Sequence, residues 1–313
     1  MAVLQALLPV FSIAVVGYLI AYKKIISASQ ADQVTKIVFV TVIPALLFLA
    51  AATAKLPENM QWDFLSSYYI AVFAVYLIGL VVASKVFAYN AKEQSIYAMG
   101  AAYSNVTIVG LPVCIYLLGE ESLLPLFIIV SVHNLALFTL GMLFAERGLW
   151  SPRSLLRSLL KILRQLVTSP ITGSLLLGAI FNLLALPIYL PLKQLLGLMS
   201  DMAVPAALFV LGASLNKYHI DGNMKSAGLM VAMKMLVLPL LVWLLAFHLF
   251  TLDPLWATTA VMTAAMPVGV SVYIFAEQYQ SCEAPVATAI VLSTLLSVVT
   301  LSVLAVIMIP IIS

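Results

Sequence analysis

Charged side chains are scarce in this sequence. Asp, Glu, Lys and Arg make up 9% of its 313 residues, against roughly 25% in soluble domains, whereas apolar residues make up 64%. No single globular core could bury such an excess, and the mean hydropathy of +1.15 indicates a polytopic membrane protein. Because a membrane-spanning helix needs about 20 apolar residues, the chain has room for about ten spans and little room for a soluble domain.

Other absences narrow the class of function. No stretch resembles the phosphate-binding loop GxxxxGK[ST], so we do not expect this chain to drive transport with ATP by itself. Only two cysteines are present, Cys114 and Cys282, and they predict no disulfide framework. We expect no catalytic residues, metal site, cofactor or nucleic-acid partner, and therefore no enzyme.

Apolar runs between charged or turn-rich breaks predict ten spans. Their approximate limits are 3–22, 34–54, 64–88, 95–119, 122–146, 166–186, 198–216, 226–249, 255–279 and 284–309. Each run is apolar over about 20 residues instead of alternating over about 10, which favours helices over transmembrane strands. The first run is not expected to be a cleaved signal, because no basic residue precedes it and it is longer than a typical signal core.

Basic residues divide unevenly between the two sides of this arrangement. Twelve of the fifteen Lys and Arg residues fall in connections on one side and two on the other, while Lys234 lies inside a span. The side rich in Lys and Arg is expected to be cytoplasmic. Both termini are therefore predicted to lie outside the cytoplasm.

The longest connection, at about 147–165, has a pattern of its own. Its basic residues recur at helical spacing with leucines between them: Arg153, Arg157, Lys161 and Arg164. This predicts a basic amphipathic helix on the inner leaflet. We interpret it as a cytoplasmic linker between a first half, 1–146, and a second half, 166–313.

The two halves share landmarks. At a shift of 161 residues, Gly17 falls on Gly178 and the segment 44–48 falls on 205–209, and at a shift of 160 residues Pro125 falls on Pro285. Since each half has five predicted spans, an odd number, the second would enter the membrane from the opposite side. The sequence thus predicts an all-α fold of two inverted five-helix repeats, an architecture that recurs in secondary transporters with the substrate site near the midplane.

Spans four and nine, at corresponding positions, each carry glycine and proline near the middle. Proline removes a backbone donor and glycine adds backbone freedom, so each span is predicted to unwind into two half-helices. Half-helix N-termini favour an anion such as a carboxylate. The alternative is a pair of proline kinks packed by neighbouring helices. The candidate substrate-binding residues are Asn105, Thr107, Gly110, Pro112, Pro267, Val268, Gly269, Val270 and Ser271.

Two ionisable side chains, His133 and Lys234, are predicted to lie deep in the membrane. Such groups are functional hypotheses by default. Lys234 could attract the anion or stabilise the half-helix C-termini, or it could snorkel toward water. His133 could carry a coupling proton, or it could be a neutral histidine that is hydrogen-bonded inside the bundle. No Asp or Glu lies deep in a span, which argues against cation exchange through buried carboxylates.

At these motifs the sequence resembles the auxin efflux carrier family, which includes plant auxin exporters and bacterial permeases for malonate, malate and similar acids. The resemblance covers the whole chain and rests on the segments 44–48, 104–112, 266–270 and 275–279. It implies that the fourth and ninth helices cross, with Asn105 contacting substrate and with Pro112 and Pro267 at the crossing. It also implies that spans one, two, six and seven form a dimerising scaffold, past which the other six move as an elevator.

Two departures from the plant exporters favour a bacterial organic-acid carrier of the inner membrane. The long cytoplasmic loop is replaced by the short basic linker, and Ser104 stands where plant exporters have a proline. The predicted function is secondary active transport of small organic anions, mono- or dicarboxylates, by a homodimer in a lipid bilayer, with a coupling proton or sodium ion left open. Two alternatives are a sodium-coupled organic-anion symporter of bile-acid-transporter-like architecture and a membrane sensor that binds a ligand without moving it.

Overall fold

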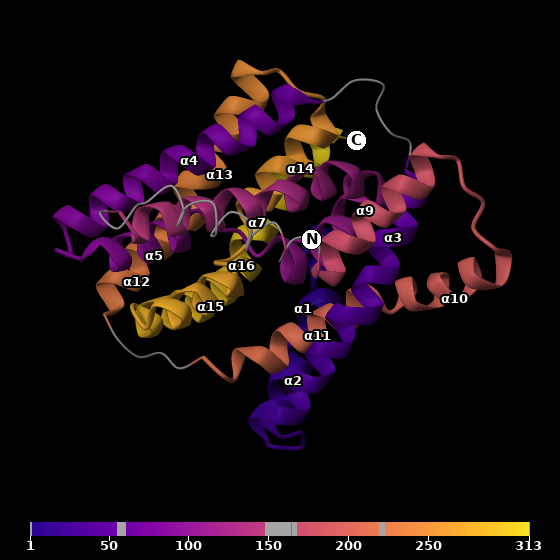
Figure 1. Ribbon diagram of the computed structural model, residues 1–313, viewed down its shortest axis with the longest axis horizontal. Helices are drawn as coiled ribbons and strands as arrows, with labels where there is room; N and C mark the ends of the chain where they lie inside the picture. The colour runs from indigo at the N-terminus through magenta and orange to yellow at the C-terminus, as the bar shows by residue number, and fades with distance from the viewer. Residues whose placement is uncertain (1, 55–60, 148–163, 165–167, 219–222, 313) are drawn as a thin grey trace.

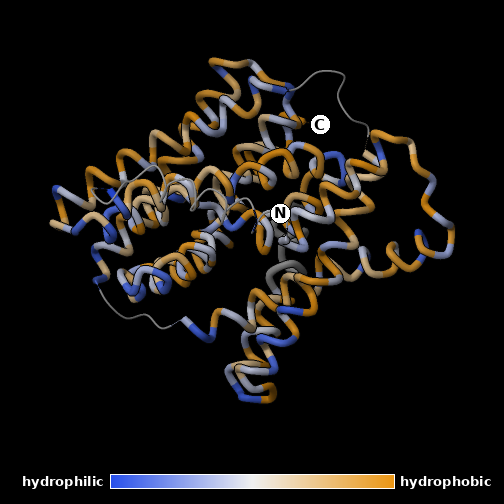
Figure 2. Tube along the Cα trace, in the orientation of Figure 1, coloured by the Kyte–Doolittle hydropathy of each residue, from blue (hydrophilic) through white to orange (hydrophobic). Residues whose placement is uncertain are grey.

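The computed structural model describes residues 2–54, 61–147, 164, 168–218 and 223–312, and the regular structure within them is helical (Figure 1). Six described helical stretches are long and apolar enough to span a membrane, and shorter apolar helices are Ser12–Tyr22, Val106–Leu118 and Pro170–Leu183. Hydrophobic residues run along most helices, and hydrophilic residues gather at helix ends and connections (Figure 2). The fold therefore agrees with the polytopic membrane protein expected from composition.

The helices of the first half precede the linker. They are α1 (Ala2–Tyr22), α2 (Ala28–Ile37), η1 (Val38–Val42), α3 (Ile43–Thr53), α4 (Trp62–Lys85), α5 (Ala91–Ala102), η2 (Val106–Gly110), α6 (Leu111–Leu118), η3 (Glu120–Ser122) and α7 (Leu123–Ala145). The predicted linker helix at 147–165 lies, apart from Arg147 and Arg164, outside the described residues.

The second half has a similar series of helices. They are α9 (Pro170–Leu183), α10 (Leu190–Asp201), α11 (Ala203–Leu215), α12 (Met224–Ala232), η4 (Met233–Val237), α13 (Leu238–Trp243), η5 (Leu244–Leu249), α14 (Pro254–Ala264), α15 (Val270–Tyr279) and α16 (Glu283–Ile312).

Two helical stretches begin earlier than the sequence predicted. The stretch expected at 34–54 begins at Ala28, because the Ser27 hydroxyl accepts the N–H of Gln30 while the Gln30 side chain accepts the N–H of Ser27. The stretch expected at 198–216 begins with α10, whose first turn holds a proline, where a missing amide hydrogen has no cost. Lys193, interpreted as part of a connection, lies in this helix.

Three prolines follow π-helical turns. Pro44, Pro112 and Pro239 each lie in the first turn of the α-helix that follows η1, η2 and η4, respectively. A proline cannot donate to the carbonyl four residues earlier, and a wider turn is one way for a helix to accommodate that loss. These prolines therefore widen their helices without ending them.

The helices form two groups, which separate across the view in Figure 1. In one group α1 packs along α11, and α3 packs along α9 and α10, with α2 against α11. In the other group α4 packs against α5, α5 against α7, α12 against α16, and α13 against α14. We call the first group the scaffold group and the second the core group.

Glycines allow two close backbone contacts inside the scaffold group. A Cβ on Gly17 of α1 would lie 2.1 Å from the carbonyl oxygen of Phe209 in α11, and a Cβ on Gly178 of α9 would lie 2.5 Å from that of Phe48 in α3. Both the glycines and the phenylalanines are 161 residues apart in the sequence. A similar glycine contact is therefore made twice, at the shift from which the sequence predicted a repeat.

Candidate functional site

Both segments that were predicted to unwind are interrupted. Helix α5 ends at Ala102 and helical structure resumes at Val106, while α14 ends at Ala264 and α15 begins at Val270. Between these ends, the N–H groups of Ser104, Asn105, Val268 and Gly269 make no helical hydrogen bonds. Inside a membrane such backbone groups need partners from protein, water or ligand.

The two interruptions supply hydrogen bonds to each other. The N–H of Asn105 donates to the carbonyl of Pro267 at 2.9 Å, and the N–H of Gly269 donates to the carbonyl of Tyr103 at 3.0 Å. The segments 103–105 and 267–269 thus run antiparallel and bond reciprocally. The helix breaks predicted from separate parts of the sequence meet at one place, which we call the crossover.

The central residues of the crossover, Ser104 and Val268, form an isolated antiparallel bridge. Their amides bond elsewhere: the N–H of Ser104 donates to His133 Nε2 of α7 at 3.1 Å, and the N–H of Val268 donates to Ser293 Oγ of α16 at 3.0 Å. His133 and Ser293 are 160 residues apart, which is one of the shifts that predicted the repeat. The two central amides of the crossover therefore each bond to a side chain, and these side chains are separated by a predicted shift.

Lys234 lies at the end of one half-helix. Its side chain is fully buried, and Nζ donates to the carbonyl of Ala264, the last residue of α14, at 2.5 Å. A cation at a helix C-terminus offsets the partial negative charge of that end. The ammonium group therefore lies at a half-helix C-terminus, and a role of Lys234 in stabilising that end stays a prediction.

A cavity of about 220 Å³ lies beside the crossover and takes its walls from both groups of helices. The predicted site residues that line it are Asn105, Thr107, His133, Gly269, Val270 and Ser271. The other lining residues are Thr35, Phe39, Tyr103, Ser104, Val106, Ile108, Val130, Asn134, Ile171 and Ile274. Residues from two helix breaks and from α2, η1, α7 and α9 thus share one space.

Five predicted residues do not line this cavity: Gly110, Pro112, Pro267, Val268 and Lys234. The resemblance placed Pro112 at the crossing, but helical structure has already resumed before it, at the start of η2. Proline fits there because the π turn of η2 accommodates the missing amide donor. Pro267, in contrast, lies in the crossover itself. For these five residues, contact with a substrate stays a prediction.

Asn105 presents an unused donor at the cavity. Its side chain is 5% exposed, and Oδ1 accepts the N–H of Ile108 at 3.3 Å, which caps η2. Within the part of the chain that the structure describes, Nδ2 has no partner. Leaving a buried amide unpaired costs about 1–3 kcal/mol, so an acceptor supplied by a ligand is the simplest explanation for it.

The N-terminus of α15 is also open to the cavity. Gly269 at its N-cap position has no side chain to cap it, and Val270 and Ser271 of the first turn line the cavity. A Cβ on Gly269 would lie 2.3 Å from Cδ1 of Tyr103, so glycine is needed for the aromatic ring to pack there. Uncapped N–H groups at a helix N-terminus attract anions.

Several residues of the site escaped the sequence-based prediction. Tyr103 donates its hydroxyl to Asn134 Oδ1, and the Tyr68 hydroxyl donates to Ser104 Oγ at 3.3 Å. Ser293 could have been found by applying the 160-residue shift to His133. Asn134 follows His133 and Tyr103 lies two residues before Asn105, so closeness in sequence to a predicted site residue could have indicated both.

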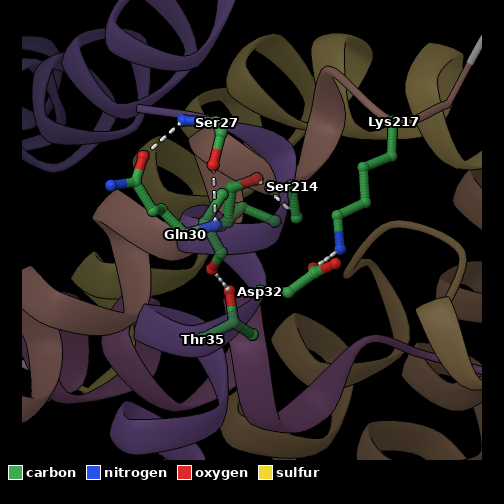
Figure 3. A network of polar contacts seen from close by, with 8 residues as sticks. Ser27, Gln30, Asp32, Thr35, Ser214 and Lys217 are labelled. Atoms are coloured by element: carbon green, nitrogen blue, oxygen red, sulfur yellow. Dashed lines mark hydrogen bonds and ion pairs between the residues drawn. The ribbon is translucent and has the colours of Figure 1, made fainter. Parts of the chain in front are cut away.

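Thr35 had no such signal, because it comes from the scaffold group. Figure 3 shows how α2 is fixed there: Asp32 pairs with Lys217, which follows α11, and Thr35 Oγ1 donates to the Ala31 carbonyl at 2.8 Å. The Asp32–Lys217 pair links α2 to the end of α11, whereas the Thr35 hydrogen bond lies within α2. Thr35 and the following Phe39 of η1 form one wall of the cavity.

Comparison with known proteins gives a consistent picture. A family model described as "Membrane transport protein" matches residues 2–305. A "Putative malonate transporter" of Rhizobium meliloti (strain 1021) is 25% identical over 299 residues, 94% of this chain and 92% of the relative. An "Uncharacterized transporter" of Methanothermobacter thermautotrophicus is 23% identical over 308 residues, 95% of each chain. The "Lysosomal cholesterol signaling protein" of Mus musculus is 26% identical over 316 residues, 93% of this chain but 36% of the relative.

Proposed function

This chain belongs to the membrane transport protein family, the auxin efflux carrier family that its motifs resemble, and on that basis we propose that it is a secondary active carrier of small organic anions, mono- or dicarboxylates. One observation carries the proposal: Asn105, whose Nδ2 has no partner among the described residues, and the uncapped N-terminus of α15 line the same cavity. An amide donor beside a positive helix end is suited to a carboxylate.

The size of the cavity supports a small substrate. Its volume of about 220 Å³ is below the range of roughly 300–1,000 Å³ found for drug-sized ligands. The name of the Rhizobium relative, a malonate transporter, points to the same class of acid. We therefore propose acids of a few carbon atoms instead of large aromatic acids.

The proposed architecture has ten membrane spans in two inverted repeats, 1–146 and 166–313, joined by the basic linker at 147–165. The repeated contact of Gly17 with α11 and Gly178 with α3 supports it. The matched acceptors His133 and Ser293 support it independently. The broken spans α5–α6 and α14–α15 take corresponding places in the two repeats.

We propose an elevator-type mechanism, in which the core group carries the crossover past the scaffold group. The cavity lies between the two groups, since Thr35 and Ile171 belong to the scaffold group and the crossover belongs to the core group. The scaffold group would also form the homodimer contact. Helix α10 supports this placement, because it has no buried residue.

The proposed orientation places the side rich in Lys and Arg in the cytoplasm and both termini outside, in a bacterial inner membrane. Ile171 lies at the start of α9, and Thr35 lies in the first third of the continuous stretch Ala28–Thr53. These helices follow Lys23, Lys24 and Arg164 in the chain. The cavity therefore opens toward the proposed cytoplasmic side. The structure would correspond to the inward-facing state.

His133 is proposed to position the crossover instead of carrying a coupling proton. Its Nε2 already accepts the N–H of Ser104, and a proton on Nε2 would displace that bond. Lys234 is proposed to compensate charge at the end of α14. The coupling ion, a proton or sodium, would then act at another place.

A counterflow screen in proteoliposomes tests the proposed function. Vesicles loaded with one unlabelled organic acid should accumulate the labelled acid transiently, and protein-free vesicles should not. Parallel assays with and without sodium and a pH gradient identify the coupling ion, and strict sodium dependence would favour the symporter alternative. Binding of acids without exchange would contradict the carrier and favour the sensor alternative.

A further inference from the structure

The cavity beside the crossover is rich in hydrogen-bonding groups but has no formally charged wall. Among the described residues that line it, none is Lys, Arg, Asp or Glu. The polar lining residues are Thr35, Tyr103, Ser104, Asn105, Thr107, His133, Asn134 and Ser271. Any positive potential at the site must therefore come from the backbone and from more distant charges.

The titratable groups that face the cavity are held in neutral hydrogen bonds. His133 of α7 accepts the Ser104 N–H at Nε2, and the hydroxyl of Tyr103 donates to Asn134. Asp32 of α2 does not line the cavity and forms an ion pair with Lys217. The lining residues on η1, η2, α9 and α15 include no further titratable side chain.

Helix termini supply the positive potential. The N-termini of η2–α6 and of α15 both line the cavity, and each helix N-terminus is equivalent to about half an elementary charge. At the C-termini of the other two half-helices, the last carbonyl of α14 accepts from Lys234 Nζ, and the carbonyl of Tyr103, which follows α5, accepts from the N–H of Gly269. The cavity thus faces the equivalent of about one positive charge.

A second negative charge would have no counter-charge in the cavity wall, because Lys234 does not line it and is bonded to the C-terminus of α14. An uncompensated ion in a low-dielectric interior is costly, and in practice it takes up a proton. A carboxylic acid group, unlike a carboxylate, has an O–H to donate, and the hydroxyl oxygens of Thr107 and Ser271 can accept it. The lining therefore suits one carboxylate together with one neutral polar group.

We propose that the site binds and carries its substrate as a monoanion, either a monocarboxylate or a dicarboxylate that retains one proton. This rests on the proposed function and adds the charge state of the acid. The proton of a half-protonated dicarboxylate comes from water before binding and travels with the acid. Each substrate molecule then carries one negative charge across the membrane.

The test measures affinity in proteoliposome counterflow with equal pH on both sides. Malonate and succinate are each compared with their monomethyl esters, which carry one negative charge throughout the pH range used. Above the second pKa of the diacid, its monoanion falls about tenfold per pH unit. The half-saturating concentration of total diacid should rise by the same factor, while that of each ester should stay constant.

The esters control for titration of the protein, since a protein group such as His133 would affect diacid and ester alike. Half-saturation by the diacids that does not change with pH, or that improves as pH rises, would show that the dianion binds and would overturn the proposal. If neither diacid nor ester binds at any pH, the proposed function itself fails.

Variants of Thr35, which is half-buried in the cavity wall, provide a second arm. Thr35→Lys adds the missing cation, and Thr35→Gln is its neutral control. Above the second pKa, Thr35→Lys should bind malonate about tenfold more tightly than Thr35→Gln, with no gain for the monomethyl ester. An equal gain in affinity for malonate and its monomethyl ester would mean that the added cation does not act on a second negative charge, contrary to the proposal.

Discussion

Asn105 serves the crossover through two different atoms. Its Oδ1 caps η2 by accepting the Ile108 N–H, whereas Nδ2 has no partner in the described structure. Asn105→Asp keeps an acceptor for the cap but replaces the donor with a negative charge. Asn105→Ala removes both functions.

We expect both variants to lose affinity for the anion. Loss of a donor to a charged acceptor costs about 1.5–3 kcal/mol, or roughly tenfold to a hundredfold in half-saturating concentration. Only Asn105→Ala should also lose about 1 kcal/mol of stability from the missing cap. Counterflow over a range of substrate concentrations and thermal unfolding in detergent measure the two effects. Wild-type transport by Asn105→Asp would remove this amide from the site.

Lys234 allows charge and hydrogen bonding to be separated. Lys234→Met removes the positive charge and the hydrogen bond from the Ala264 carbonyl, and this should cost about 1–3 kcal/mol of stability. Lys234→Gln keeps a neutral donor. If the positive charge matters for the anion, Gln should recover stability but leave affinity about tenfold weaker. Melting temperature and counterflow affinity that match wild type in Lys234→Met would disprove both effects.

At the scale of elements, α7 and α16 support the crossover from opposite sides. His133→Phe and Ser293→Ala each leave one amide of the Ser104–Val268 bridge without its acceptor. We expect each to cost about 1–3 kcal/mol of stability. His133→Gln retains an acceptor oxygen and should transport with the wild-type dependence on pH. A changed pH profile in that variant would restore the coupling-proton interpretation of His133.

The glycine contacts give a prediction with an internal control. Gly17→Ala and Gly178→Ala would each place a methyl group against backbone of a neighbouring helix, at 2.1 and 2.5 Å from a carbonyl oxygen. Overpacking of this kind costs about 1–3 kcal/mol. Gly197→Ala in α10, where nothing lies within 4 Å, should be neutral or slightly stabilising because alanine favours helix. Thermal unfolding of the three variants in detergent measures these effects. An equal loss of stability in all three variants would contradict the contact.

The sequence predicted that two helices are broken, but it predicted less well at which residues the breaks lie. Gly269 and Pro267 marked the second break correctly, because neither favours continued helix and both lie within it. In the first segment Pro112 was misleading, since a proline after a π turn can be accommodated inside a helix. The break lies earlier, at Tyr103, Ser104 and Asn105, where local propensity gives little warning and bonding to the partner segment decides.

At the scale of the whole molecule, composition and motifs were enough for the polytopic class and the family. They could not place Thr35 and Ile171 opposite the crossover, because this depends on how α2 and α9 pack in three dimensions. Ser293 lay within reach of the repeat shift, whereas the partner of Lys234 did not. Sequence patterns thus predict the class and the family, but they do not predict most contacts between segments that are far apart in the chain.

The proposed orientation of the molecule in the membrane rests on the distribution of Lys and Arg, and it can be tested at two residues that the structure describes. Lys24 follows α1 and Glu121 lies in η3, on opposite sides of the proposed membrane. In a background with Cys282→Ser, the remaining Cys114 is fully buried and should not react. Glu121→Cys should then react with a membrane-impermeant maleimide in intact cells, and Lys24→Cys only after permeabilisation, because Lys and Arg are retained on the cytoplasmic side. The reverse pattern would invert the proposed topology and turn the cavity at Thr35 toward the outside.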